Sequence, residues 1–168
     1  MGVCGCGKST VGSRLAQQLG VGFIDGDDLH PPSNVAKMAS GTPLTDLDRW
    51  PWLREVGRTL REHTSTGLVV ACSALRRSYR DAIRMHAPGA MFLHLHGDRD
   101  VIESRMDARR SHFMPSSLLT SQLDTLESLD KHEPGITIDI NAPLNVVVHH
   151  ALHALSERER STCTPAQQ

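Results

Sequence analysis

Apolar residues along this chain follow two kinds of spacing. Val11, Leu15 and Leu19 recur every four residues, which predicts a helix that ends at Gly20. The run at 67–72 is apolar without interruption, as in a strand that is buried on both faces. The same criteria predict further strands at 21–24, 91–95 and 136–140, and helices at 31–38, 46–64 (interrupted near Pro51), 73–85, 100–110, 116–126 and 143–155.

Strands that alternate with helices predict an α/β fold with three layers, in which a parallel sheet carries helices on both faces. The length of 168 residues suits a single domain, which we place at residues 1–155. Residues 156–168 are mostly polar and predict a flexible tail.

Composition and charge narrow the range of partners. A net charge of -1 gives no general attraction to nucleic acid or to an anionic membrane, so we expect neither as a partner. No run approaches the roughly 18 apolar residues of a membrane span, and no secretory signal opens the chain. The 4 cysteines fit no zinc or disulfide pattern, and reduced thiols indicate a cytoplasmic location.

Residues 2–10 read Gly-Val-Cys-Gly-Cys-Gly-Lys-Ser-Thr and match the P-loop pattern G-x-x-x-x-G-K-S. Glycines allow a tight turn whose N–H groups point at phosphate oxygens, and the following helix adds its dipole. In this pattern Lys8 reaches the β- and γ-phosphates and Ser9 holds magnesium. A chance glycine-rich turn is the alternative, but the helical spacing directly afterwards favours an ATP-binding phosphotransferase. The predicted nucleotide-binding residues are Gly2, Gly5, Cys6, Gly7, Lys8, Ser9 and Thr10.

A P-loop normally follows a buried strand, but only Met1 precedes Gly2 in this sequence. We therefore expect either that the sequence is shortened at its N-terminus or that its start was assigned late. The absent strand would be central in the sheet, so its loss would remove much core burial and lower stability.

Acidic side chains follow the strand predicted at 21–24. Asp25 and Asp27 would lie at the carboxyl end of that strand, where open α/β sheets form their binding crevice. Carboxylates there can hold magnesium or accept a proton from a substrate hydroxyl. An acidic turn that caps the next helix is the alternative.

Basic side chains follow two other predicted strands. Arg105 and Arg109 lie four residues apart on one helical face, and a mobile lid at about 105–115 would place them over the transferred phosphoryl group. A solvated basic face is the alternative. Arg76, Arg77 and Arg80 fit an anionic substrate and a solvated face equally well.

Two tryptophans, Trp50 and Trp52, flank Pro51. A core anchor is a better interpretation than a substrate wall. The 10 histidines include no pair with convincing metal-ligand spacing, so we expect no histidine metal site.

Several longer segments resemble the gluconokinases. Besides the P-loop, they are Asp25-Gly-Asp-Asp-Leu-His, the stretch 37–53 with Gly-x-Pro-Leu-x-Asp-x-Asp-Arg-x-Pro-Trp-Leu, Ala-Cys-Ser-Ala-Leu at 71–75 with Tyr-Arg at 79–80, and His-Phe-Met-Pro at 112–115 with Gln122 and Thr-Leu-Glu at 125–127. The resemblance extends from Gly2 to about residue 155. Cys4 and Cys6 depart from it, because serines are more usual there.

The resemblance implies transfer of the ATP γ-phosphate to the 6-hydroxyl of D-gluconate, a nucleoside-monophosphate-kinase-like P-loop fold with a moving lid, and a homodimer. By likeness to shikimate kinases, Asp25 would serve Mg2+ and Asp27 would accept the hydroxyl proton. The resemblance also assigns Arg105 to adenine, Asn141 to the adenine border and Arg109 to the phosphates. It places His30, Lys37, Arg49 and Arg80 around gluconate.

Two other functions stay open at this point. One is a kinase for another small hydroxy acid such as shikimate, against which the Asp-Arg-x-Pro-Trp-Leu and His-Phe-Met-Pro segments argue. The other is a non-catalytic ATP-binding module from a truncated kinase. The missing strand favours that module, and the retained Lys8, Ser9 and Asp27 oppose it.

Overall fold

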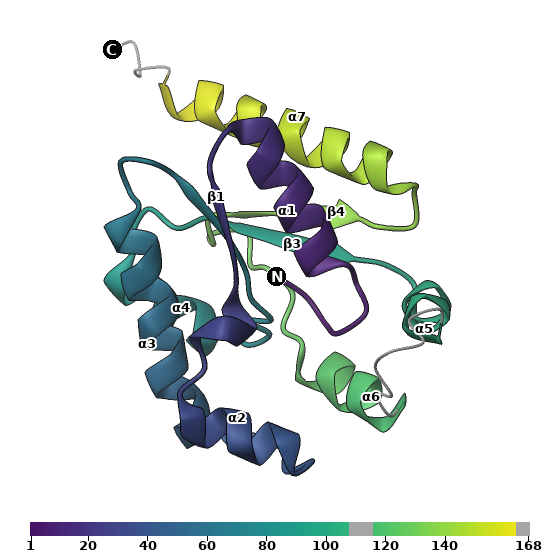
Figure 1. The fold of residues 1–168 in the computed structure, drawn as a ribbon. Coiled ribbons are helices and arrows are strands. Elements are labelled where there is room, and N and C mark those ends of the chain that lie inside the picture. Colours follow the sequence, from purple (N-terminus) through teal and green to yellow (C-terminus); the bar gives the residue numbers. More distant parts are fainter. Residues whose placement is uncertain (108–115, 164–168) are drawn as a thin grey trace.

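Helices and strands alternate along the chain, as the spacing of apolar residues predicts (Figure 1). The computed structural model describes residues 1–107 and 116–163. In chain order the elements are α1 (Lys8–Leu19), β1 (Gly22–Asp25), the 3-10 helix η1 (Gly26–Leu29), α2 (Pro32–Ala39), α3 (Asp46–Glu62), β2 (Leu68–Ala71), α4 (Arg77–His86), β3 (Phe92–His96), α5 (Arg99–Asp107), α6 (Ser116–Thr125), β4 (Gly135–Asp139) and α7 (Leu144–Cys163).

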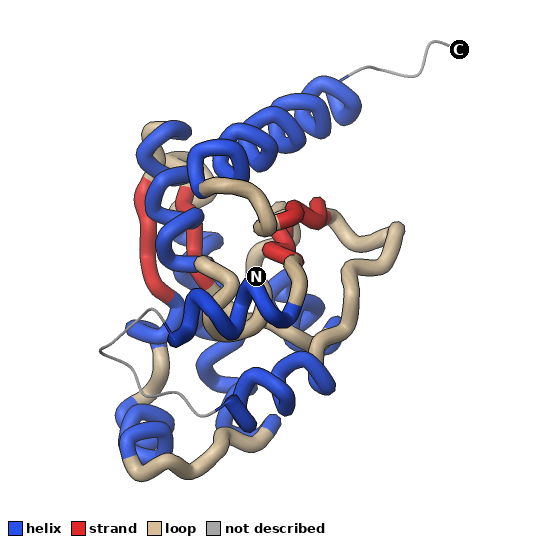
Figure 2. The backbone as a smooth tube through the Cα atoms, turned by 90° about the vertical axis from the view of Figure 1, so that its right-hand side faces the viewer, coloured by secondary structure: helices blue, strands red, loops and turns tan. Residues whose placement is uncertain are grey.

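The strands form two parallel pairs. β1 pairs with β2, with Phe23 opposite Val69, and β3 pairs with β4, with Leu93 opposite Ile136. Figures 1 and 2 show the two pairs standing apart, with the N-terminus between them. The parallel pairing confirms the predicted α/β class.

Helices cover both faces of these strands. Figure 1 shows α1 and α7 together on one side and α3 and α4 together on the other. Each side has its own buried apolar cluster. The first contains Val11, Leu15, Leu95, Ile138 and Val147, and the second contains Trp52, Leu53, Val56, Ile83 and Phe92. None of the helices within residues 1–107 and 116–163 is long and apolar enough to cross a membrane.

Helix α3 is continuous, so the predicted interruption near Pro51 is wrong. A capping box starts the helix, because Thr45 Oγ1 accepts from the Asp48 amide at 3.3 Å and Asp48 Oδ2 accepts from the Thr45 amide at 2.9 Å. Trp52 and Leu53 are then fully buried in the next turn. Capping and burial together offset the single backbone hydrogen bond that a proline cannot make.

Two other helix ends differ from expectation. Helix α4 begins at Arg77 rather than after Ser73, because residue Ala74 has a positive φ of 40° and the backbone there is not helical. Helix α7 continues to Cys163, and Arg158 Nη1 donates to the Gly135 carbonyl at 2.7 Å. Residues 156–163 are therefore part of that helix and not a tail, and residues 164–168 lie outside the described part of the chain.

Candidate active site

The P-loop wraps the N-terminus of α1. Gly5 has φ 77° and Gly7 has φ 92°, values that L side chains rarely adopt. A Cβ on Gly5 would also lie 2.5 Å from Met106 Cγ. The amides of Gly5 and Gly7 have no protein acceptor among the residues that the structure describes. The loop therefore presents free N–H donors beside the positive end of a helix, as a phosphate site requires.

Lys8 and Ser9 are the first two residues of α1. Lys8 Nζ donates to the Val3 carbonyl at 2.9 Å, so its ammonium lies across the loop. Ser9 Oγ donates to Asp25 Oδ2 at 2.5 Å. That contact joins the P-loop to the end of β1 and confirms that the two predicted motifs meet.

Ser9 and Asp25 fit a magnesium ion by the chemistry of their donor atoms. Both offer hard oxygens, and Mg2+ is usually bound by one or two such protein groups together with substrate phosphates and water. Within the described residues, no group of three or more His, Cys, Asp or Glu side chains could hold a metal ion. A magnesium site with only Ser9 and Asp25 from the protein would take its other oxygen ligands from ATP and water.

Asp27 lies two residues beyond Asp25, at the open end of β1. The Asp25 side chain caps η1, since its Oδ1 accepts from the Asp27 amide at 3.2 Å. Partial desolvation and the neighbouring Asp25 carboxylate raise the pKa of Asp27 above its ordinary value. A carboxylate with a raised pKa is a better proton acceptor than an ordinary aspartate.

Trp52 holds η1 in place from helix α3. Its indole N–H donates to the Gly26 carbonyl at 2.7 Å, and its ring stacks on His30 with centroids 4.3 Å apart. A Cβ on Gly26 would lie 2.6 Å from the Ala71 carbonyl oxygen, so η1 also lies tight against the end of β2. Trp52 is 1% exposed, which confirms the core interpretation and adds a positioning role.

His30 is neutral and its tautomer is set by Asn34. Burial and the nearby Arg49 charge lower the pKa of His30 to about 4. Asn34 Nδ2 lies 2.8 Å from the Asp48 carbonyl oxygen and 3.2 Å from His30 Nδ1. Because a carbonyl oxygen can only accept, the amide nitrogen must face it, and Nδ1 of His30 then accepts as well. The ring proton is therefore on Nε2.

Arg49 and Lys37, the two other predicted cations near His30, differ in whether a protein group already binds them. Arg49 is half-buried, and its guanidinium has no hydrogen bond or ion pair among the described residues. Lys37 Nζ instead lies 2.5 Å from Asp48 Oδ1 in an ion pair. The structure thus leaves Arg49 free beside His30, while Lys37 is held by a protein carboxylate.

A hollow of about 260 Å³ lies on the other side of the P-loop. Its lining includes Gly5, Gly7, Thr10, Arg105 and Leu144. Arg105 Nη2 donates to the Ile140 carbonyl at 2.7 Å, which holds the guanidinium at the rim. Asn141 is adjacent to the hollow in sequence but bonds Asp98 through both its amide atoms at 3.2 Å. The position suits a nucleotide base beside the phosphate loop.

Comparisons with known proteins decide the family. A model of the shikimate kinase family matches residues 4–135. The shikimate kinase of Aquifex aeolicus vf5 shares the fold with a TM-score of 0.60 at 16% identity, over 95% of each chain. The thermoresistant gluconokinase of Escherichia coli (strain K12) is 42% identical over 160 residues, which are 94% of this chain and 91% of that protein. The gluconokinase of Gluconobacter oxydans (strain 621H) is 45% identical over 154 residues, 90% and 86% of the two proteins.

A solved structure agrees with these relatives. A gluconokinase from Sinorhizobium meliloti 1021 superposes with a TM-score of 0.85 at 46% identity, over 98% of this chain and 95% of that one. The chain belongs to the gluconokinase family. The predicted resemblance and the P-loop kinase fold are both confirmed.

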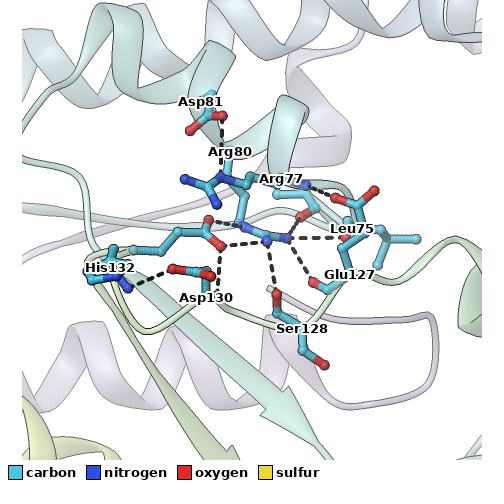
Figure 3. A network of polar contacts seen from close by, with 10 residues as sticks. Leu75, Arg77, Arg80, Asp81, Glu127, Ser128, Asp130 and His132 are labelled. Atoms are coloured by element: carbon cyan, nitrogen blue, oxygen red, sulfur yellow. Dashed lines mark hydrogen bonds and ion pairs between the residues drawn. The ribbon is translucent and has the colours of Figure 1, made fainter.

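Membership in the gluconokinase family does not make every predicted residue a ligand, and Arg80 is the clearest correction. Arg80 is 0% exposed. Its Nε and Nη2 donate to the Glu133 carboxylate at 2.6 and 2.9 Å, and its remaining N–H groups donate to the carbonyls of Ala74, Leu75, Glu127 and Ser128 at 3.1–3.3 Å. Figure 3 shows this ring of acceptors around the guanidinium. Since all five donors are used inside the protein, Arg80 is a structural residue and has no donor left for gluconate.

Sequence reasoning missed three residues that hold residues of the predicted site in place. Asn34 and Glu133 are buried and orient His30 and Arg80. Asp46 accepts from Tyr79 Oη at 2.5 Å and from Arg76 Nη1 at 2.8 Å, close to the acceptor side. Lone Asn and Glu residues in polar stretches carry no sequence signal, and their roles follow from partners that are distant along the chain.

Two predicted features lie outside the described residues. They are Arg109 and the lid segment beyond Asp107, including the His-Phe-Met-Pro stretch at 112–115. Arg105, at the described end of α5, lines the hollow beside the P-loop.

Proposed function

We propose that this protein is a gluconokinase that transfers the γ-phosphoryl group of ATP to the 6-hydroxyl of D-gluconate. The observation that carries the proposal is the contact between Ser9 Oγ and Asp25 Oδ2 at 2.5 Å. It joins a phosphate-binding loop to the end of β1, where Asp27 and His30 follow in η1 and at its C-terminal end. The names of relatives at 42–45% identity supply the substrate.

On the nucleotide side, Lys8 leaves the Val3 carbonyl and binds the β- and γ-phosphates, and the free amides of Gly5 and Gly7 bind phosphate oxygens. Ser9 and Asp25 would hold Mg2+, which would supply positive charge against the phosphate oxygens. Arg105 lies against the base. Arg109, with the lid at about 105–115, is proposed from the family resemblance to face the transferred phosphoryl group.

On the acceptor side, Asp27 accepts the proton of the 6-hydroxyl as that oxygen attacks the γ-phosphorus. The new bond joins the 6-oxygen to phosphorus, and the bond to the β,γ-bridging oxygen breaks, giving ADP and 6-phosphogluconate. The raised pKa of Asp27 assists the proton transfer.

Gluconate recognition rests on Arg49 and His30. The free guanidinium of Arg49 suits the carboxylate, since it offers a planar pair of donors. The Nε2–H of His30 donates to a hydroxyl or carboxylate oxygen without adding a charge. His30 remains neutral at physiological pH, because its pKa lies near 4.

A coupled assay tests the proposal directly. Purified protein, Mg-ATP and D-gluconate are mixed with 6-phosphogluconate dehydrogenase, and NADPH formation is followed, with shikimate-dependent ADP release as the parallel control. NADPH that appears only with gluconate supports the proposal. Folded protein that binds ATP but phosphorylates neither acid contradicts it and favours the non-catalytic module.

Asp27→Asn tests whether Asp27 acts as the general base, because it should change turnover without changing ATP binding. The amide keeps the size of the side chain but cannot accept the proton, so turnover should fall by about 10²–10⁴-fold. The affinity for ATP, measured by calorimetry, should change little, because Asp27 does not contact the P-loop. Wild-type turnover in this variant would show that another group removes the proton.

We also propose, from the family resemblance, that the protein is a cytoplasmic homodimer. Sedimentation equilibrium of the purified chain tests the oligomeric state. A single species with the mass of one chain at micromolar concentration would contradict the dimer.

A further inference from the structure

The face of α6 that packs onto the P-loop carries one polar side chain among apolar ones. Leu119 is fully buried in the apolar cluster that also contains Val3 of the P-loop, and Leu123 packs against that cluster. Gln122 lies three residues after Leu119 and beside Leu123, so it is on the same face of the helix. A polar side chain on such a face costs free energy unless it finds a hydrogen-bond partner. The partner of Gln122 therefore indicates what the residue does.

That partner is a backbone amide of the P-loop. Gln122 Oε1 accepts a hydrogen bond from the Cys4 amide at 2.7 Å, although the two residues are 118 apart along the chain. Figure 1 shows α6 beside the turn that precedes α1. The amides of Gly5 and Gly7 in the same loop have no protein acceptor among the described residues. The side chain of Gln122 thus binds the amide that comes directly before those left free for phosphate.

Lys8 holds the other end of the same peptide group. The Val3 carbonyl, which belongs to one peptide unit with the Cys4 amide, accepts from Lys8 Nζ at 2.9 Å. It also accepts from the Cys6 amide at 3.4 Å. This unit is trans, so its C=O and N–H point in opposite directions. Lys8 and Gln122 therefore fix the orientation of the peptide from its two sides.

Helix α5 restrains the first turn of the P-loop by packing. A Cβ on Gly5 would lie 2.5 Å from Met106 Cγ, and Cys4 Sγ is 3.8 Å from Met106 Sδ. Such packing limits how far the loop can move, but apolar contacts have no preferred direction and do not select which way a peptide faces. A hydrogen bond does select it, because it weakens steeply as its angle departs from linear. The orientation of the peptide at Cys4 therefore depends on its hydrogen bonds.

We propose that Gln122 is a positioning residue for ATP, which keeps the Val3–Cys4 peptide in its present orientation while the phosphates bind Lys8. The inference rests on the proposed function, in which Lys8 leaves the Val3 carbonyl when ATP binds. Of the two short hydrogen bonds to this peptide, at 2.7 and 2.9 Å, only the one to Gln122 then remains. Gln122 becomes the main restraint on the peptide when the adjacent Gly5 amide has to meet a phosphate oxygen.

Loss of the Gln122 acceptor should affect ATP and not gluconate. A half-buried amide that loses its acceptor is unfavourable, so the peptide would rotate toward another partner and displace the Gly5 amide with it. No hydrogen bond joins Gln122 to Asp27, His30 or Arg49 within the part of the chain that the structure describes. The expected defect is therefore in the affinity for ATP, with gluconate recognition intact.

Three variants of the full chain test the role of Gln122. Gln122→Met keeps the length of the side chain but removes the acceptor, and Gln122→Glu keeps an acceptor oxygen. Gln18→Met makes the first substitution at an exposed position on α1 and is the control. Hydrogen exchange of the Cys4 amide is measured by NMR in the ATP-free protein, and the affinity for ATP by calorimetry. The coupled assay gives the KM for gluconate, and circular dichroism gives the melting temperature.

Gln122→Met should speed exchange of the Cys4 amide by at least ~10-fold, because that amide loses its acceptor. The affinity for ATP should fall by about 5–30-fold, as expected when one hydrogen bond to a half-buried group is lost. The KM for gluconate should stay within about twofold of the wild-type value. The melting temperature should fall by no more than about 5 °C. Gln18→Met should match the wild-type protein in all four measurements.

Gln122→Glu distinguishes the hydrogen bond from the charge. Its carboxylate still accepts from the Cys4 amide, so the exchange rate should stay within about threefold of the wild-type rate. Its negative charge opposes the ATP phosphates, so the affinity for ATP should fall relative to the wild-type protein, and added salt should reduce that difference. The loss in Gln122→Met should not depend on salt, because no charge changes. A merely structural role for Gln122 predicts neither result.

An unchanged exchange rate at Cys4 in Gln122→Met would overturn the proposal, as would an unchanged affinity for ATP once that protection is lost. Matching losses for ATP and gluconate, or a larger fall in melting temperature, would show a general structural role and overturn it too. A failure of the proposed function looks different. If the wild-type protein binds ATP but phosphorylates no gluconate, exchange and calorimetry still decide the role of Gln122.

Discussion

The nucleotide side and the acceptor side of the active site are built in different ways. The nucleotide side is local, because residues 2–10 supply the loop, the cation and the hydroxyl, and α1 follows at once. The acceptor side is assembled from three segments. Asp27 and His30 come from η1 and its end, Asn34 from α2, and Arg49 and Trp52 from α3.

This difference decides how each side responds to substitution. Backbone amides form most of the phosphate site, so few side chains there are indispensable, but each of those acts directly on the phosphates. On the acceptor side, one buried residue sets the orientation of another, and positioning residues matter as much as contact residues. Five variants follow, ordered by expected effect.

Lys8→Ala should have the largest effect. Phosphoryl transfer depends on placed positive charge, so turnover should fall by about 10³-fold or more. The melting temperature should barely change, because Lys8 Nζ makes its one bond to the Val3 carbonyl. Steady-state kinetics with Lys131→Ala as the control, which removes an exposed lysine that has no proposed role, gives the matched comparison. A turnover loss no greater than in the control would contradict the assignment of Lys8 to the phosphates.

Arg80→Met and Arg49→Met compare a structural arginine with a binding one. Removing Arg80 leaves Glu133 buried without its partner, which should cost about 3–5 kcal/mol of unfolding free energy. Arg49→Met should leave stability within about 0.5 kcal/mol and raise the KM for gluconate by about 10–100-fold.

Urea unfolding and kinetics on the two arginine variants give both readouts. In the fraction of Arg80→Met that remains folded, the KM for gluconate should be close to wild type. A raised KM with unchanged stability in Arg80→Met would restore the substrate role that its burial contradicts.

Asn34→Ala should lower catalytic efficiency with gluconate, although Asn34 is proposed to contact no substrate. Loss of the bond to His30 Nδ1 frees the ring to change tautomer and tilt, so kcat/KM for gluconate should fall by about 5–20-fold. The KM for ATP should be unaffected, which a purely destabilising substitution would not achieve selectively. Asn145→Ala, at an exposed position on α7, is the control. Equal losses for both substrates would indicate a general structural effect.

His94→Leu should change the free energy of unfolding least at neutral pH and more in acid. The folded pKa of His94 is about 4 against 6.5 unfolded, so the unfolded chain binds a proton first as the pH falls. The contribution of neutral His94 to the free energy of unfolding is therefore fully present above pH 6.5 and is lost as the pH falls toward 4. In the variant, that decline should be smaller by roughly 2–3 kcal/mol.

Urea midpoints from pH 7.5 to pH 4 measure the His94 effect, with the exposed His150→Leu as the control. His30 titrates in the same direction in both proteins and cancels from the comparison. The Met1 ammonium, Arg80 and His96 lie near His94, and the pKa of the Met1 amine, near 6, lies above that of His94. Parallel midpoint curves for His94→Leu and the wild-type protein would contradict the prediction.

Local pattern was enough to predict much of this protein. The spacing of Val11, Leu15 and Leu19 predicted α1, because residues four apart lie on the same face of a helix. The P-loop and the Asp25–Asp27 pair were also predicted, since each is a short segment whose chemistry depends on its own backbone. Helix ends were less accurate: Pro51 lies inside α3, and α7 extends beyond residue 155.

The sequence by itself determined the family, the phosphate-binding loop and the residue types on the acceptor side of the active site. Only the tertiary structure decided which of those side chains already have a partner within the protein. Arg49 and Arg80 are the same residue type, yet Glu133 and four carbonyls accept from every donor of Arg80, whereas the guanidinium of Arg49 has no partner among the described residues. The same holds for the cavity of about 720 Å³ between β2 and β3, whose lining comes from α1, α3, β2, α4 and β3, elements that only folding brings together. Partners distant along the chain settle such questions, because hydrogen bonding and burial depend on position in space and not on order in the sequence.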